Sequence, residues 1–142
     1  MIRFVIWGDP VAQGRPRTAV INGRPRLYDP EKSRHYKELV RLVAQEARPN
    51  HLIEGPVSLT VRIFKRFPAS FSKRAREQAR AGNIRPATKP DASNILKAIE
   101  DALNGVVWVD DRQIVDLIVT KAYDDDPRVE VEIREIKEAK AG

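Results

Sequence analysis

The chain has 142 residues, a formal net charge of +6 and no cysteine. This length matches one ordinary domain of about 100–150 residues, and the missing thiols exclude disulfides, thiolate zinc sites and cysteine nucleophiles. No stretch approaches the roughly 18 apolar residues of a membrane span, and the first residues do not resemble a signal peptide. We therefore expect a single domain over residues 1–142, no membrane contact and a cytoplasmic location. With only His35 and His51, any metal would be held by oxygen.

The charge is divided unevenly along the chain. Residues 1–90 carry 19 basic and 7 acidic side chains, whereas residues 91–142 carry 7 basic and 13 acidic ones. A basic body attracts polyanions such as nucleic acid. The acidic third would repel phosphate unless a divalent cation bridged the two. The division is compatible with a metal-dependent nuclease, and also with a solvated acidic sheet that offsets a basic face.

The first quarter of the chain contains three local signals. Alternating apolar residues predict a strand over residues 2–6, which the turn at 8–10 ends. Asn22-Gly23 is typical of a tight hairpin turn within a basic segment. Asp29-Pro30-Glu31 is typical of a helix start with Asp29 as the cap, and helical spacing of apolar residues then continues to Arg48.

The rest of the chain alternates strands and helices. Clean alternation predicts a half-buried strand over residues 57–63. A short basic helix begins at Ser72, and a second helix follows Asp91 and runs to Leu103. Two further strands are expected over residues 113–121 and 129–133, joined as a hairpin by an acidic turn. These elements predict a compact α+β domain with about three helices and a mainly antiparallel or mixed sheet.

The 91–103 helix carries candidate chemistry on its polar face. At 100° per residue its apolar residues collect on one arc, so Asp91 and Lys97 can face one groove. Asp110-Asp111 directly precedes an apolar strand, and the two carboxylates repel unless solvent or a cation offsets their charge. If the helix packs on that strand, Asp91, Asp110 and Asp111 would converge into oxygen ligands suited to Mg²⁺ or Mn²⁺. Helix cap and polar turn remain the alternatives for these residues.

The segment from Pro68 to Val115 resembles the RusA family of Holliday-junction resolvases. Three ordered blocks carry the resemblance, Lys89-Pro90-Asp91, Asp101-Ala102-Leu103-Asn104-Gly105 and Asp110-Asp111-Arg112-Gln113. The earlier Gly14-Arg15-Pro16-Arg17 is similar to a segment of many members. The resemblance implies a small homodimer, often encoded by phages and prophages, that binds four-way DNA junctions and nicks two strands symmetrically with Mg²⁺ or Mn²⁺.

The resemblance also assigns residues. It implies that Asp91 is the first catalytic aspartate, Lys97 the catalytic lysine and Asp111 the later metal-binding aspartate, with Asp110 beside it. Asn94 and Asp101 recur in the family's blocks and are candidates for support. The best-known members have a second aspartate where this chain has Ser93, which offers only a neutral oxygen. Asp110 or Asp101 could compensate for the lost charge, or the protein could be a weak or inactive binder of branched DNA.

Basic residues outside this region are candidates for phosphate contacts, which position DNA without reading its bases. A solvated basic surface is the alternative, as is a protein whose acidic third binds a basic partner. The candidates are Arg15, Arg17, Arg24, Arg26, Lys73, Arg74, Arg76, Arg80 and Lys89.

Overall fold

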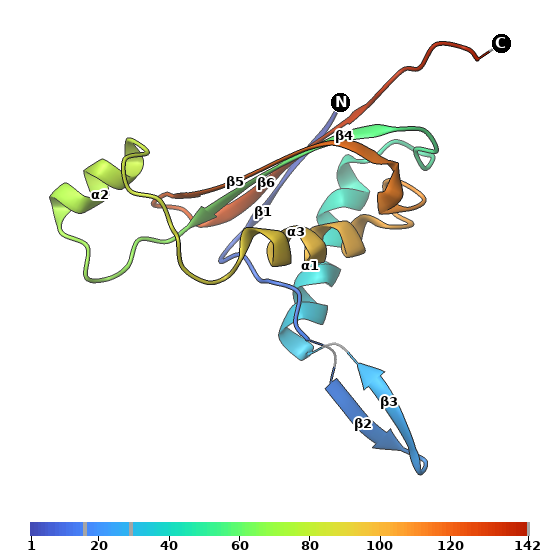
Figure 1. Cartoon of the computed structure of the whole chain (residues 1–142), viewed down its shortest axis with the longest axis horizontal. Coiled ribbons are helices and arrows are strands. Elements are labelled where there is room, and N and C mark those ends of the chain that lie inside the picture. The colour runs from blue at the N-terminus through green and yellow to red at the C-terminus, as the bar shows by residue number, and fades with distance from the viewer. Residues whose placement is uncertain (16, 29, 142) are drawn as a thin grey trace.

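The structure is a computed structural model, and it describes residues 1–15, 17–28 and 30–141. Within these residues the chain forms three α-helices, a four-stranded sheet and a separate two-stranded sheet, which confirms the expected α+β class (Figure 1). The elements in chain order are β1 (Ile2–Trp7), β2 (Arg17–Ile21), β3 (Arg24–Tyr28), α1 (Glu31–Ala47), β4 (Val57–Lys65), α2 (Lys73–Arg80), α3 (Ala92–Leu103), the short 3₁₀ helix η1 (Asp111–Gln113), β5 (Ile114–Tyr123) and β6 (Arg128–Glu135).

The main sheet has the strand order β1-β6-β4-β5. β6 is antiparallel to both β1 and β4, whereas β4 and β5 are parallel. α1 and α3 pack against the same face of this sheet, and α2 lies beyond one end of it (Figure 1). β5 stands last in this order and pairs with β4 alone, so it is an edge strand of the sheet.

The core lies between the sheet and the two long helices. Alternate residues of β4, from Val57 to Ile63, are fully buried, as the period of two predicts for one covered face. They meet Val40 from α1 and Ile99 from α3 in one apolar cluster. The opposite face of the sheet is polar, with Arg62 paired to Glu132 at 3.3 Å. Because the apolar side of α3 packs on the covered face of the sheet, the polar side of α3 remains in solvent.

The expected hairpin between the last two strands is wrong. β5 and β6 are not neighbours, because β4 lies between them. The connection crosses the end of β4, where the Asp124 amide donates to the Lys65 carbonyl at 3.0 Å. In this order Val61 of β4 lies opposite Val119 on one side and Val131 on the other. The acidic turn after β5 is present, but the two strands that it joins pair with β4 on its two sides instead of with each other.

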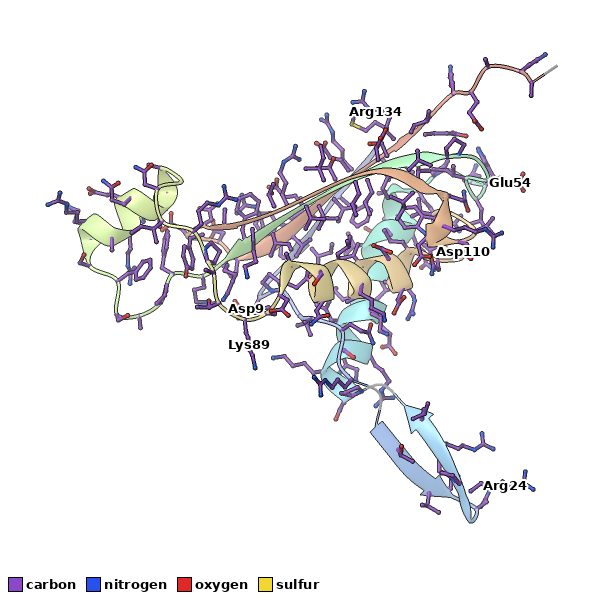
Figure 2. The ribbon with its side chains drawn as sticks, in the orientation of Figure 1. Asp9, Arg24, Glu54, Lys89, Asp110 and Arg134 are labelled. Atoms are coloured by element: carbon purple, nitrogen blue, oxygen red, sulfur yellow. The ribbon has the colours of Figure 1, made fainter. Side chains whose placement is uncertain are left out.

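The hairpin expected around Asn22-Gly23 is confirmed. Asn22 and Gly23 have φ values of 53° and 74°, the left-handed conformations that a tight hairpin turn needs. β2 and β3 project away from the sheet and the helices (Figure 1). Arg24 stands at the end of this arm (Figure 2). The basic segment therefore extends to a point remote from the core.

The helix starts agree largely with the sequence signals. Ser72 caps α2, since its hydroxyl accepts a hydrogen bond from the Ala75 amide at 3.1 Å. Pro30 is the residue before α1, and Asp29, expected as that helix's cap, lies outside the described residues. No helix in the described part of the chain has the length and apolar character needed to cross a membrane.

Candidate active site on the polar face of α3

The faces of α3 divide as the helical wheel predicts. Ile95, Ala98 and Ile99 are fully buried, whereas Lys97 is exposed. The remaining polar side chains, Ser93, Asn94, Glu100 and Asp101, are exposed or partly exposed. Because the apolar face is held by the core, the polar residues form a fixed row along the outside of the helix.

Asp91 stands at the N-terminal end of this row. It occupies the N-cap position of α3, but its side chain accepts no capping hydrogen bond from the helix backbone. The preceding loop is held to the sheet by Lys121 of β5, whose Nζ donates to the Thr88 carbonyl at 2.7 Å and the Pro90 carbonyl at 3.0 Å. Lys65 of β4 adds a bond to the Thr88 hydroxyl at 3.0 Å. Two lysines from parallel strands thus position Asp91.

A basic hollow lies along the first half of the row. Arg15, Lys37 and Lys97 line an open hollow of about 480 Å³, together with Asn94 and Asp101. The Lys37 side chain is 7% exposed, and its Nζ lies 3.9 Å from an Asp101 oxygen. The neighbouring hollow is lined by Arg15, Lys89, Asp91 and Asn94, among others. Positive side chains therefore surround the helix start on the side that Asp91 faces.

Gly14 explains how Arg15 reaches this hollow. A Cβ atom on Gly14 would stand 2.6 Å from Cγ of Pro30, a separation that side chains do not adopt. The absence of a side chain lets the N-terminal segment approach the start of α1 closely. Arg15 then lines both hollows, whereas the side chain of Arg17, a further candidate, lies outside the described part of the structure.

Asp110 and Asp111 stand at the other end of α3. Asp110 is the N-cap of η1, and its carboxylate accepts from both the backbone and the guanidinium of Arg112, each at 3.3 Å. A hydrogen bond from Asp111 and the Arg112 amide lower the pKa of Asp110. Asp110 therefore belongs to a polar turn, one of the two alternatives that the sequence left open. Its carboxylate caps the turn that presents Asp111.

Gln113 holds this turn in place. Its Oε1 accepts from the amides of Val109 and Asp110, each at 2.9 Å. Its Nε2 donates to the carbonyls of Ile53 and Gly55, at 2.8 and 2.9 Å. One side chain therefore ties the two aspartates to the loop before β4.

Sequence reasoning missed Glu100. Its carboxyl group lies against Asp111, and burial followed by the negative charge and hydrogen bond of Asp111 raises the pKa of Glu100 to about 7. Lys97, one turn earlier, opposes this shift. The available signal was the spacing of three between Lys97 and Glu100, which places both side chains on one helix face.

The expected convergence of Asp91 with Asp110 and Asp111 does not occur within one chain. α3 has 12 residues, so its ends are about 18 Å apart. Lys89 and Asp110 lie near opposite ends of this helix (Figure 2). Among the described residues no three acidic or histidine side chains come together closely enough to hold a metal ion. The single chain instead presents a basic end with Asp91 and an acidic end with Glu100 and Asp111.

The candidate phosphate-binding residues fall into different environments. Lys73 and Arg74 are exposed on α2. Arg76 and Arg80 lie over the ring of Phe67, and Arg80 also makes two hydrogen bonds with Asp125, at 2.7 and 2.8 Å. Arg76 and Arg80 therefore have structural roles within the fold. Arg24 and Arg26 are exposed on the projecting arm, and Lys89 is exposed beside Asp91.

Comparison with known proteins decides the family. A family model described as "Endodeoxyribonuclease RusA" matches residues 8–134, which include both ends of α3. The chain belongs to the RusA family. It is also 48% identical over 137 residues to the "Uncharacterized protein YqaN" of Bacillus subtilis (strain 168), which covers 95% of this chain and 96% of that protein. Membership of the RusA family indicates endodeoxyribonuclease activity and the junction-resolving class of nuclease.

The four hydrogen bonds of Gln113 make a testable prediction about stability. Gln113→Ala leaves partly buried backbone groups without partners, and each such group costs about 1–3 kcal/mol. We expect the free energy of unfolding to fall by about 2–4 kcal/mol in urea titrations. Gln78→Ala, at an exposed position on α2, is the matched control and should change it little. An unchanged midpoint for Gln113→Ala would show that the turn is held by other contacts.

Proposed function

We propose that this protein is a divalent-metal-dependent endodeoxyribonuclease that resolves four-way DNA junctions by paired, symmetric nicks. Residues 1–142 act as one domain, in the cytoplasm of a bacterium that carries the gene itself or in a prophage. The observation that carries the proposal is the arrangement on α3, where Lys97 lies between a basic hollow and the carboxyl groups of Glu100 and Asp111. In metal-dependent phosphodiester hydrolysis, basic side chains stabilise the charge on the phosphate and carboxylates hold the cation.

The basic hollow is suited to a DNA phosphate. Arg15, Lys37 and Lys97 approach it from three separate segments of the chain, and cations in such a concave surface hold a phosphate and release its counterions. Asn94, which donates to Asp91 at 3.5 Å, adds a neutral polar group. Lys97 stands nearest the acidic end and would stabilise the charge that develops on the leaving oxygen.

The acidic end would supply part of the oxygen ligands of a divalent cation. Asp111 touches both Asp110 and Glu100, and adjacent carboxylates repel when ionised unless a cation offsets their charge. Oxygen donors of this kind suit Mg²⁺ or Mn²⁺. A bound ion would supply Lewis-acid activation at the scissile phosphate. Asp111 would hold it, and Asp110, which accepts from the Arg112 amide, would fix the turn that presents Asp111.

Dimerisation would reconcile Asp91 with this site. β5 is hydrogen-bonded to β4 along one edge, and its side chains Val115, Leu117 and Ile118 are 60%, 48% and 58% exposed. An exposed apolar edge strand is a site for pairing with another strand. Two nicks need two active sites, so a second copy of this chain is the occupant we propose, with the two β5 edges related by a two-fold axis.

This pairing has a consequence for the site. β5 runs antiparallel to α3, since Lys121 bonds to Pro90 at the helix start while Asp111 lies against Glu100 near its end. Strands paired by a two-fold axis are antiparallel to one another. The Asp91 end of one α3 would therefore lie beside the acidic end of the other. Asp91 would then complete the site across the dimer rather than within one chain.

The dimer is tested by Ile118→Lys. A charge on the exposed edge strand blocks edge pairing, so light scattering after size exclusion should change from the mass of two 16.1 kDa chains to that of one. Val20→Lys, at a still more exposed apolar position on the β2–β3 arm, should remain dimeric. A monomeric wild-type protein, or a dimeric Ile118→Lys, would exclude this interface.

The cleavage activity is tested by Asp111→Asn. We expect Mg²⁺-dependent nicking of a labelled four-way junction to fall by about 100-fold or more, beyond the loss that outer-sphere partners of a metal cause. Junction binding should persist or tighten, because a carboxylate near phosphate is removed. The measurement compares the junction with a matched linear duplex, in Mg²⁺ and in EDTA.

Other results of that assay favour other functions. Ser93 motivates the alternative of an inactive branched-DNA binder, which requires tight junction binding by the wild-type protein and no cleavage in Mg²⁺ or Mn²⁺. An interaction protein that binds a basic partner would show no preference for the junction. Retained cleavage in Asp111→Asn would remove Asp111 from the metal ligands.

The DNA surface is tested through the salt dependence of binding. Arg74 is exposed on α2, and each phosphate contact contributes about one to the slope of log affinity against log salt concentration. Arg74→Ala should reduce that slope by about one. Arg134→Ala removes the same charge at a site remote from α2 (Figure 2) and should leave the slope unchanged. Equal slopes for wild type and Arg74→Ala would place α2 outside the DNA contact.

A further inference from the structure

One face of the β2–β3 arm is uncharged and mainly apolar. Opposite residues of an antiparallel pair share a face, and successive residues alternate between the two faces. The register places Thr18 opposite Leu27 and Val20 opposite Pro25, and these four residues form what we call the apolar face of the arm. Val20 and Leu27 are each 74% exposed. Because an isolated two-stranded hairpin is at best marginally stable in water, an exposed apolar face on such a hairpin indicates a binding surface.

The opposite face of the arm is basic. Arg24 lies opposite Ile21 and Arg26 lies opposite Ala19, and both arginines are exposed. The sequence between residues 10 and 28 contains four arginines and no acidic residue. Two such arms would repel each other, whereas a polyanion would be attracted to either one. Charge complementarity therefore favours DNA as the occupant of the arm over a second copy of this chain.

The base of the arm adjoins the basic hollow at the start of α3. The Gln13 amide donates to the Asn94 carbonyl at 2.9 Å, and Arg15 lines the hollow just before the arm begins. Each strand of the arm has five residues, so the arm extends roughly 17 Å. It projects away from the sheet and the helices (Figure 1). DNA with a phosphate in the hollow would thus meet the arm as well.

We propose that the β2–β3 arm distinguishes a four-way junction from linear DNA. The apolar face packs against bases at the branch point through Val20 and Leu27, while Arg24 and Arg26 bind the flanking phosphates. This inference rests on the proposed junction-resolving function, and it assigns recognition of the branch to residues outside α3.

The chemistry of the branch point explains why an apolar face would select it. In a continuous duplex each base pair is stacked on both sides, so the apolar surfaces of the bases are covered. At the centre of a four-way junction this stack is interrupted, and exposing a base costs least where its pairing or stacking is already disturbed. Aliphatic side chains and proline are the groups that DNA-binding proteins insert between base steps. A groove about 12 Å wide admits a two-stranded ribbon, so the arm can reach such a step.

The test compares a four-way junction with a linear duplex of the same sequence, by fluorescence anisotropy in EDTA so that neither DNA is cut. The double variant Val20→Ser, Leu27→Ser removes the apolar groups and keeps both arginines. We expect it to weaken junction binding by about tenfold or more, because apolar contacts are lost, and to leave duplex binding unchanged. Leu42→Ser, at a 63% exposed position on α1, is the matched control and should bind both DNAs as the wild type does.

A fluorescent adenine analogue at the branch point provides a second measurement. Its emission rises when the base unstacks, so we expect a rise when the wild-type protein saturates the junction and little rise with the double variant at saturation. Arg24→Ala keeps the apolar face and should lower the slope of log affinity against log salt concentration by about one for both DNAs. A wild-type slope for the double variant on the duplex verifies that its arm still reaches the phosphates.

The outcomes separate this inference from the proposed function. If the wild-type protein prefers and nicks the junction, but the double variant either matches Leu42→Ser or loses affinity for both DNAs alike, the arm does not recognise the branch and the proposed function stands. If the wild-type protein shows no preference for the junction, the proposed function itself fails. A change of the double variant from two 16.1 kDa chains to one would assign the apolar face to a second copy and overturn the assignment to DNA.

Discussion

The burial of one face of α3 is the constraint on which the candidate site depends. Ile95, Ile99 and Leu103 are fully buried and join the same core as the central strand β4. Rotating the helix to move any polar residue would expose these side chains, at about 1.5–3 kcal/mol each. The row from Asp91 to Glu100 is therefore as fixed as the core. Apolar packing of α3 therefore holds the polar side chains of this row at fixed positions on the helix.

Long-range hydrogen bonds then fix what lies at each end of the row. Lys121 holds the loop that leads into Asp91, and Gln113 holds the turn that presents Asp111. Both side chains bond to carbonyl groups of distant segments, so neither role is visible in local sequence patterns. Each places a carboxylate by fixing the backbone beside it and makes no bond to the carboxylate itself. This separation of positioning from binding is what a metal or phosphate site requires.

Local signals predicted the elements well, because caps, turns and periodicity act over a few residues. Ser72 and Asn22-Gly23 behave as their chemistry predicts. The order of strands was not predictable in this way, since a turn after β5 does not specify whether the strands it joins are neighbours. The convergence of Asp91 with Asp111 failed for a related reason, because the helical wheel gives angles around α3 but not the end of it that the next strand approaches. Glu100 became evident only through its contact with Asp111.

Ser93 places a neutral side chain where the best-known members of the RusA family have an aspartate. A missing carboxylate lowers the affinity of a site for a divalent cation only if the total negative charge around the ion falls. In this chain the helix face that begins with Ser93 carries the acid Glu100 two turns further on, and the next residue, Asp101, lies 3.9 Å from the buried Lys37. Under the proposed function, Lys97 would neutralise a phosphate between the basic hollow and the acidic end of α3. Under the proposed dimer, Asp91 of one copy would place a carboxylate near Asp111 of the other, so a serine at position 93 would not by itself abolish the site.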